Sequence, residues 1–234
     1  ASEVELVAGL RRVGFGLRHP RLLSRVRGGV ELVALVCGRV EVVERLRVDP
    51  RRYLPALSPR RGFRSSRVEH LLQGLVAAMP AEEVYFEVGT LEGRTLEAAA
   101  HANDDKTLIG CDPCEKYDLL PEPFGPNITF IKGTWQQVLK DIGFLLPIGC
   151  AFYDGDHSAA HTAAFMQCVE EHMADEAVLV LDDWDRETVR EGAYRSGHCW
   201  RLLREMPCYG DGLTCPQNWF GYSFGVSVWG FRRG

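Results

Sequence analysis

Short apolar runs alternate with helix-like segments from residue 84 onward. The runs lie at residues 84–88, 107–111, 128–131, 151–153 and 177–181, and helices are predicted between them at residues 95–103, 134–142 and 158–173. Continuous apolar strands joined by helices are typical of a parallel sheet that is covered on both faces. A further helix is predicted over residues 186–205. The alternating tail at residues 224–231 predicts an antiparallel strand added to the sheet.

The first 80 residues have a different pattern. Apolar side chains recur at helical spacing in three sets, at residues 4–10, 32–36 and 68–76, and prolines separate the first two sets from the third. We therefore predict an N-terminal helical extension or lid over residues 1–80 and a sheet-containing domain over residues 81–234. The N-terminal helices also offer a surface for a homo-oligomer.

Composition restricts the class of protein. The chain has 234 residues, 46% of them hydrophobic and 25% charged, with a formal net charge of −5. These values are typical of a soluble globular protein, and the acidic balance argues against nucleic acid as the main partner. No apolar run is long enough for a membrane span, and the eight cysteines are scattered without a secretory signal. We expect a cytoplasmic protein that acts on a small molecule and binds no membrane.

The end of the first predicted strand carries a glycine turn. Glu87 precedes Gly89 by two residues, and Gly93 follows Gly89 by four. Glycine allows a positive φ and a close approach of the main chain to a ligand. The spacing differs from that of dinucleotide-binding and triphosphate-binding loops, and no lysine follows Gly93. The segment therefore predicts a site for a ligand with cationic or hydroxyl groups, although such a turn is also common in α/β proteins without one.

Polar residues also follow the second and third predicted strands. Asp112 comes after the second strand, where a carboxylate can accept hydrogen bonds from both ribose hydroxyls of a nucleoside. The alternative is an ordinary loop aspartate. Gly133 and Thr134 follow the third strand and are placed to border an adenine, whereas Thr134 could equally act as a helix N-cap.

The fourth and fifth strand ends are the most acidic. The sequence Asp154-Gly155-Asp156-His157-Ser158 follows the fourth strand, and Asp182-Asp183 follows the fifth. Neighbouring parallel strands would bring Asp154, Asp182 and Asp183 together, and a divalent cation would relieve their repulsion. Oxygen ligands favour Mg²⁺, Mn²⁺ or Ca²⁺. Helix capping explains one acid at each strand end but not two.

Together these motifs resemble class I S-adenosylmethionine-dependent methyltransferases. The segments at residues 153–158 and 181–183 are most similar to the metal-dependent group that includes macrocin-type and novobiocin-type sugar O-methyltransferases and cephalosporin-hydroxylase-like proteins. They are more distantly similar to catechol O-methyltransferase. The resemblance covers roughly residues 80–185. It implies a Rossmann-like sheet of seven mostly parallel strands, with one antiparallel C-terminal strand and helices on both faces.

The resemblance also implies a role for each motif. The cofactor's methionine part would be held by Glu87, Gly89, Thr90 and Gly93, its carboxylate by Arg94 and Thr95, its ribose by Asp112 and its adenine by Gly133 and Thr134. Asp154 would border the cofactor and, with Asp182 and Asp183, would hold Mg²⁺. The base would be Asp156 or His157. Residues 159 and 160 are alanines where this group usually has an aromatic residue, so the surroundings of the acceptor differ.

These interpretations predict an Mg²⁺-dependent O-methyltransferase. Its acceptor would be a hydroxyl of a small molecule, such as a natural-product sugar or a phenol, and the metal would lower the pKa of that hydroxyl. Two alternatives remain open from the sequence. One is a metal-dependent hydrolase or phosphoesterase that uses the same acids and His157. The other is a non-catalytic module with a methyltransferase-like fold.

Overall fold

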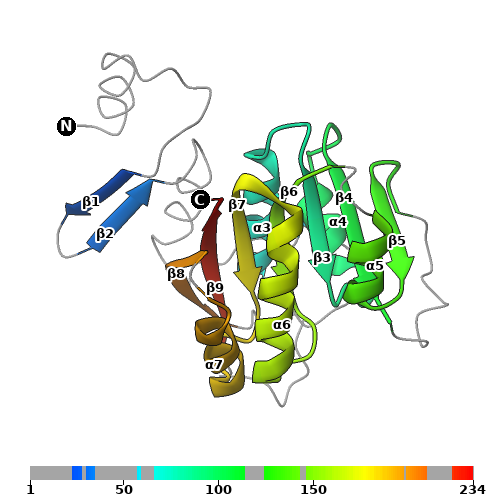
Figure 1. Ribbon diagram of the computed structural model, residues 1–234. Helices are drawn as coiled ribbons and strands as arrows, with labels where there is room; N and C mark the ends of the chain where they lie inside the picture. Colours follow the sequence, from blue (N-terminus) through cyan, green and yellow to red (C-terminus); the bar gives the residue numbers. More distant parts are fainter. Residues whose placement is uncertain are drawn as a thin grey trace.

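Seven strands form the central sheet of the protein (Figure 1). The computed structural model describes residues 23–27, 30–34, 57–58, 66–113, 124–142, 146–197, 199–209 and 223–233. The strands are β3 (Val84–Val88), β4 (Thr107–Asp112), β5 (Ile128–Lys132), β6 (Ile148–Tyr153), β7 (Met173–Leu181), β8 (Trp200–Tyr209) and β9 (Ser223–Arg232). Their order across the sheet is β5-β4-β3-β6-β7-β9-β8. The five strands from β5 to β7 are parallel, and β9 runs antiparallel to both of its neighbours. The prediction of a Rossmann-like, mostly parallel sheet is confirmed.

Helices cover both faces of this sheet (Figure 1). One face packs against α3 (Ser66–Ala77) and α4 (Arg94–Ala100). The other packs against α5 (Trp135–Ile142), α6 (Ala159–Val169) and α7 (Glu187–Arg195), and a short 3-10 turn, η2 (Glu170–His172), follows α6. Successive strand residues point to opposite faces, so Tyr85 joins one core and Phe86 the other.

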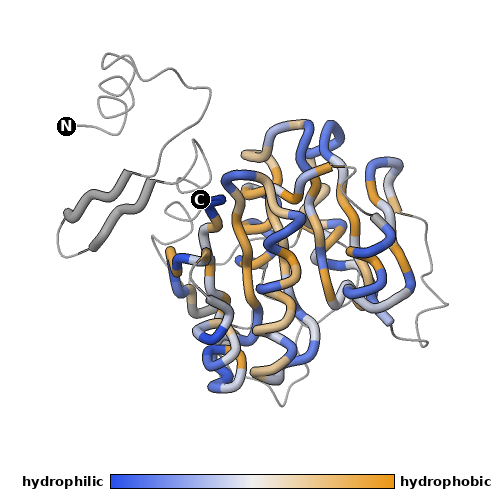
Figure 2. The backbone as a smooth tube through the Cα atoms, in the orientation of Figure 1, coloured by the Kyte–Doolittle hydropathy of each residue, from blue (hydrophilic) through white to orange (hydrophobic). Residues whose placement is uncertain are grey.

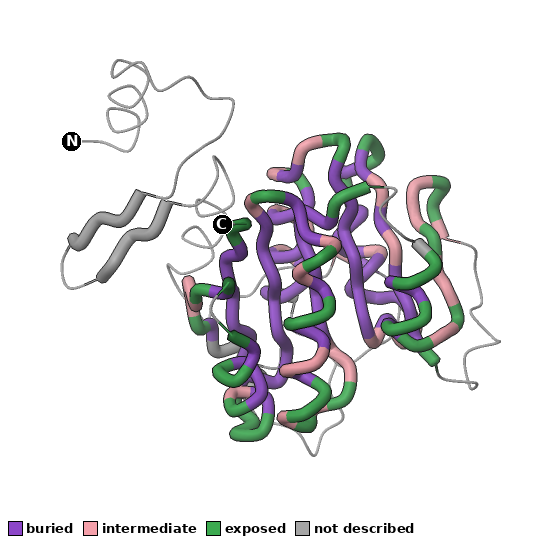
Figure 3. The backbone as a smooth tube through the Cα atoms, viewed as in Figure 1, coloured by how far each residue is buried: buried purple, intermediate pink, exposed green. Residues whose placement is uncertain are grey.

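The inner strands are apolar because both of their faces are covered. All five residues of β3 and all six of β6 are buried. Figure 2 shows the strands as the hydrophobic centre of the molecule, and Figure 3 shows the same strands as its most buried part. In β5, by contrast, no residue is fully buried, since this strand lies at an edge of the sheet. Polar atoms needed for chemistry therefore have to lie at the strand ends.

The predicted helix over residues 186–205 is wrong in its second half. Helix α7 ends at Arg195, and residues 200–209 instead form β8, which pairs with β9 along its length. Residues 196–199 separate the two elements, and Gly197 among them has a φ of 115°, a value that suits glycine. The sheet hydrogen bonds to β9 override the helical character of this segment, which has strong helix formers such as Leu203 and Glu205.

The prediction of a helix around residues 32–36 is also wrong for its first part. Strand β1 (Leu23–Arg27) pairs antiparallel with β2 (Val30–Ala34), which includes Leu32 and Val33. Two glycines lie between the strands in the sequence, a pair typical of hairpins. The third apolar set does form a helix, α3, whereas the first set, at residues 4–10, lies outside the described residues. The domain boundary at residue 80 stays a prediction.

No helix in the described part of the chain is long and apolar enough to cross a bilayer.

Candidate functional site

The glycine turn after β3 has an unusual backbone. Gly89, Leu91 and Gly93 all have positive φ, at 81°, 51° and 81°. The N–H groups of Gly89 and Thr90 donate to the carbonyl of Cys111 in β4, at 3.0 and 3.3 Å. The turn therefore lies across the carboxyl ends of β3 and β4. Strand β4 lies on one side of β3 and β6 lies on the other, so the strand order reverses at β3. Open α/β sheets bind ligands at the carboxyl ends of the strands beside such a reversal.

Gly89 also touches the strand on its other side. A Cβ atom at this position would lie 1.9 Å from the carbonyl oxygen of Asp154, well inside contact distance. The N–H of Asp154 in turn donates to the carbonyl of Val88 at 2.9 Å. Only glycine permits this approach. The contact joins the glycine turn directly to the acidic loop after β6, so the two predicted sites are adjacent.

Asp112 lies over the same turn. Its carboxylate accepts a hydrogen bond from the N–H of Leu91 at 2.9 Å, and its carbonyl accepts one from the N–H of Gly133 at 3.0 Å. The structure thus brings the predicted ribose residue beside the glycine turn and beside Gly133. Thr134 is exposed, and its hydroxyl accepts from the N–H of Gln137 at 3.4 Å, as the N-cap interpretation predicts.

Glu87 faces the protein interior. It is 0% exposed, and its carboxylate accepts hydrogen bonds from the hydroxyls of Tyr85 at 2.7 Å and Thr95 at 2.8 Å. Burial, followed by the negative charge of Glu87, raises the pKa of Tyr85 well above its usual value. The geometry indicates that Glu87 and Thr95 fix the shape of the turn from behind. Their direct contact with a cofactor stays a prediction.

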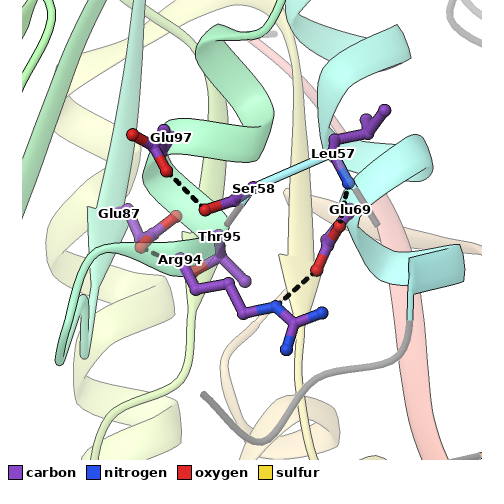
Figure 4. A network of polar contacts seen from close by, with 7 residues as sticks. All are labelled: Leu57, Ser58, Glu69, Glu87, Arg94, Thr95 and Glu97. Carbon is purple, nitrogen blue, oxygen red and sulfur yellow. Dashed lines mark hydrogen bonds and ion pairs between the residues drawn. The ribbon is translucent and has the colours of Figure 1, made fainter. Parts of the chain in front are cut away.

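Arg94 belongs to a second buried polar network (Figure 4). Its Nε lies 2.5 Å from the carboxylate of Glu69 in α3, and the two residues are 5% and 0% exposed. Glu69 also accepts the N–H of Leu57 at 2.6 Å. Ser58 donates to Glu97 in α4 at 2.5 Å. The network holds α3, α4 and residues 57–58 together behind the glycine turn. Sequence reasoning missed Glu69, although a carboxylate among the apolar positions of a helix was a usable signal.

The acidic residues after β6 and β7 form a compact cluster with a histidine. Asp154, His157 and Asp183 each offer one ligand atom, and these atoms lie within 4.8 Å of one another. Nε2 of His157 is 3.2 Å from Oδ2 of Asp183. The structure thus brings together two of the three predicted metal ligands and adds His157. Asp182, which is 3% exposed, is not one of these three residues.

Asp183 has a special conformation at the centre of this cluster. Its φ is 50°, in the left-handed region that is uncommon for residues other than glycine, and its side chain is 10% exposed. Besides His157, the same oxygen Oδ2 contacts Nε of Arg186 at 3.0 Å. Strained residues of this kind cluster at functional sites. Arg186 was not predicted from the sequence as a site residue.

The loop that carries His157 is fixed at several points. The carboxylate of Asp156 accepts the N–H of Ser158 at 2.7 Å, and its carbonyl accepts the hydroxyl of Tyr153 at 3.0 Å. The hydrogen bonds from Ser158 lower the pKa of Asp156, which is exposed and therefore ionised at neutral pH. From α7, the hydroxyl of Thr188 donates to the carbonyl of His157 at 2.6 Å.

Helix α7 lies tightly against α6 beside this loop (Figure 1). A Cβ atom on Gly192 would lie 2.5 Å from the carbonyl oxygen of Ala159, so glycine sets the distance between the helices. This packing places Thr188, from the start of α7, against His157. Arg186 lies three residues after Asp183 in the sequence and reaches it within the same turn. Sequence reasoning had no signal for the Thr188 contact, because it depends on how the two helices pack, whereas the short spacing of Asp183 and Arg186 was a usable signal.

Comparison with known proteins gives methyltransferases as the proteins that this chain resembles. A family model described as a methyltransferase domain matches residues 86–184, the segment that includes the glycine turn, Asp112 and the His157 cluster. No curated protein matches the sequence. Among solved structures, a candidate O-methyltransferase from Klebsiella pneumoniae superposes with a TM-score of 0.59 at 14% identity, covering 82% of this chain and 90% of that chain.

Two further solved structures have the same fold. The O-methyltransferase from Bacillus cereus in complex with SAH has a TM-score of 0.56 at 15% identity, covering 82% of this chain and 90% of that chain. The cofactor-bound protein Rv0187 from MTB has a TM-score of 0.57 at 14% identity, covering 76% of this chain and 85% of that chain. At these identities the similarity shows a common fold. With the matched domain, it supports a methyltransferase that depends on S-adenosylmethionine.

Proposed function

We propose that this protein is an O-methyltransferase that transfers the methyl group of S-adenosylmethionine to a small-molecule hydroxyl beside a divalent metal ion. The observation that carries the proposal is the contact between Gly89 and Asp154. Through this contact the glycine turn, which would hold the cofactor, lies directly against the loop that carries Asp154 and His157. A methyl donor and a hydroxyl acceptor must meet at one point, and these two sites are adjacent.

The residues at the turn fit an adenosine-containing cofactor. The carboxylate of Asp112 lies next to Leu91 and Gly133 at the carboxyl edge of β4, where it can accept hydrogen bonds from ribose hydroxyls. Gly133 and Thr134 would border the base. Glu87, Thr95 and Arg94 would support the turn through the buried networks behind it rather than by their charge at the ligand.

The cluster also fits a divalent ion. Two carboxylates and an imidazole, with ligand atoms within 4.8 Å of one another, are a suitable donor set for a divalent metal ion. When bound, such an ion would lower the pKa of an acceptor hydroxyl. Asp156 would take the proton, because it is ionised, exposed and in the same loop. His157 would then act as a ligand of the metal ion and so help to orient the acceptor. The protein would position the acceptor hydroxyl for in-line attack on the methyl group.

Cofactor binding and metal removal test the proposal. Calorimetry of the purified protein with S-adenosylmethionine should show one saturable site per chain. Methyl transfer to a panel of sugar and phenol acceptors should then be lost on addition of EDTA and restored by a divalent metal. A protein that binds no S-adenosylmethionine would contradict the function. Activity that is unchanged by EDTA would contradict the metal's part in it.

The substitution Asp156→Asn tests the base. Asparagine keeps an Oδ1 that can accept the N–H of Ser158, so the loop should keep its shape. We expect kcat to fall about 100-fold or more, because general-base catalysis typically contributes roughly 10²–10⁴-fold, while S-adenosylmethionine affinity stays constant. Ser158→Ala is the comparison variant, since it removes the cap on His161 and the hydroxyl that helps to lower the pKa of Asp156, but keeps the carboxylate itself. A kcat close to that of the wild type would show that Asp156 only holds the loop in place through the N–H of Ser158.

A further inference from the structure

The cluster differs from an all-oxygen magnesium site in two ways that the structure shows. One of its three ligand atoms is a nitrogen, from His157, and one of its carboxylates, Asp183, already has a cation beside it. We infer that the site selects a first-row transition ion over Mg²⁺, and that Arg186 occupies Asp183 until the ion displaces it. This inference rests on the metal part of the proposed function.

The nitrogen ligand is held in place by the protein. The carbonyl of His157 accepts the hydroxyl of Thr188 at 2.6 Å, and its Nε2 lies 3.2 Å from Asp183. Imidazole nitrogen suits transition ions, whereas Mg²⁺ prefers oxygen ligands and retains water. A set of one imidazole and two carboxylates therefore favours ions such as Mn²⁺, Fe²⁺ or Co²⁺.

Arg186 competes with such an ion for a single oxygen. Nε of Arg186 and Nε2 of His157 both contact Oδ2 of Asp183, at 3.0 and 3.2 Å. A divalent ion on that oxygen would repel the guanidinium strongly at this range. The two carboxylates of the cluster carry two negative charges, which an ion of charge two neutralises by itself.

The position of Arg186 makes it easy to displace. Its side chain is 55% exposed, whereas that of Asp183 is 10% exposed, so the arginine can move into solvent and the aspartate cannot. Exposed ion pairs contribute little to stability. Arg186 is also the N-cap of α7, where it makes no side-chain capping bond and where the helix dipole disfavours a cation. The ion pair with Asp183 is thus the contact that holds the side chain at the cluster.

Manganese binding to the full-length protein, freed of metal, tests this inference without any need for activity. Free Mn²⁺ is followed by its electron paramagnetic resonance signal during a titration in the absence of acceptor. Arg186→Gln is expected to bind Mn²⁺ about threefold to tenfold more tightly than wild type. The matched control is Arg195→Gln, which removes the same charge from the exposed pair with Glu191 at the other end of α7 and should leave the affinity nearly unchanged.

Spectroscopy of the bound ion tests the nitrogen ligand. Pulsed resonance of the wild-type complex should show a coupling to ¹⁴N that His157→Gln removes. The same variant should reduce the preference for Mn²⁺ over Mg²⁺ in competition titrations. The inference is wrong if Arg186→Gln binds Mn²⁺ no more tightly than wild type, if no ¹⁴N coupling is seen, or if no saturable site exists.

Calorimetry with S-adenosylmethionine on the same samples separates the two proposals. Cofactor binding without Mn²⁺ binding would contradict the metal site and this inference, but it would not contradict the proposal that the protein transfers a methyl group. Selective Mn²⁺ binding without cofactor binding would overturn the proposed function and support the ion selection.

Discussion

Gly89→Ala is expected to lower the free energy of unfolding by about 2–6 kcal/mol, because it adds left-handed backbone strain to a steric clash. The φ at this position is 81°, and a Cβ atom would lie 1.9 Å from the carbonyl oxygen of Asp154. To relieve that clash, the turn and the loop after β6 must separate. Since both predicted sites meet at this contact, we also expect S-adenosylmethionine binding to be lost. Urea unfolding and calorimetry measure the two effects.

Gly133→Ala is the matched control for this prediction. Gly133 lies at the same edge of the sheet, but the nearest atom to a Cβ added there would be a methyl of Val138 at 3.8 Å, an ordinary contact. The free energy of unfolding of Gly133→Ala should therefore differ from that of the wild type by less than about 1 kcal/mol. If Gly89→Ala were as stable as Gly133→Ala, the turn would not be held against Asp154 as described.

Glu69→Ala is expected to destabilise the fold by about 3–5 kcal/mol, since it leaves the buried guanidinium of Arg94 without its carboxylate. Glu69 is 0% exposed and Arg94 is 5% exposed, so water cannot easily replace the lost partner. The N–H of Leu57 loses its acceptor at the same time. Thermal and urea unfolding give the change, and Glu191→Ala, in the exposed pair with Arg195, should cost less than about 1 kcal/mol.

A double substitution distinguishes the loss of the ion pair between Glu69 and Arg94 from the loss of the other contacts that Glu69 makes. Glu69→Met with Arg94→Met replaces the pair by apolar side chains of similar length, and exchanges of this kind are often neutral or stabilising. The double variant should recover much of the stability that Glu69→Ala loses. If it is at least as unstable as Glu69→Ala, Glu69 in Figure 4 contributes through its hydrogen bond from the N–H of Leu57 rather than through the ion pair with Arg94.

The fold could be predicted from the sequence wherever burial decides the structure. The apolar run at residues 84–88 predicts a strand with the observed bounds, because both faces of β3 are covered and the run is almost continuously apolar. Residues 200–209 give no such signal, because β8 lies at an edge of the sheet and is defined by its partner β9. The strand assignment there depends on pairing with a segment that comes later in the chain, which local periodicity does not contain.

The sequence predicted where the candidate site lies in the fold better than it predicted which side chains meet there. Strand-end reasoning places Asp112, Asp154 and Asp183 at one edge of the sheet, and the structure has them there. The cluster contains His157 rather than Asp182, and Asp183 has a left-handed backbone; no motif signals either feature. Thr188 reaches the site through the packing of α7 on α6, which the sequence does not indicate. Arg186 lies only three residues after Asp183, so its contact was open to prediction.

The place of β9 between β7 and β8 has a consequence for how the chain folds during synthesis. Strand β7 is made before residue 182, but the neighbour that completes its outer side spans residues 223–232. Until that segment leaves the ribosome, β7 presents an apolar edge with open backbone hydrogen-bonding groups, the kind of surface that recruits other chains. Strand β8, whose only partner in the described sheet is β9, has to wait as well. A nascent chain is therefore open to aggregation and to chaperones at this edge until β9 has been made.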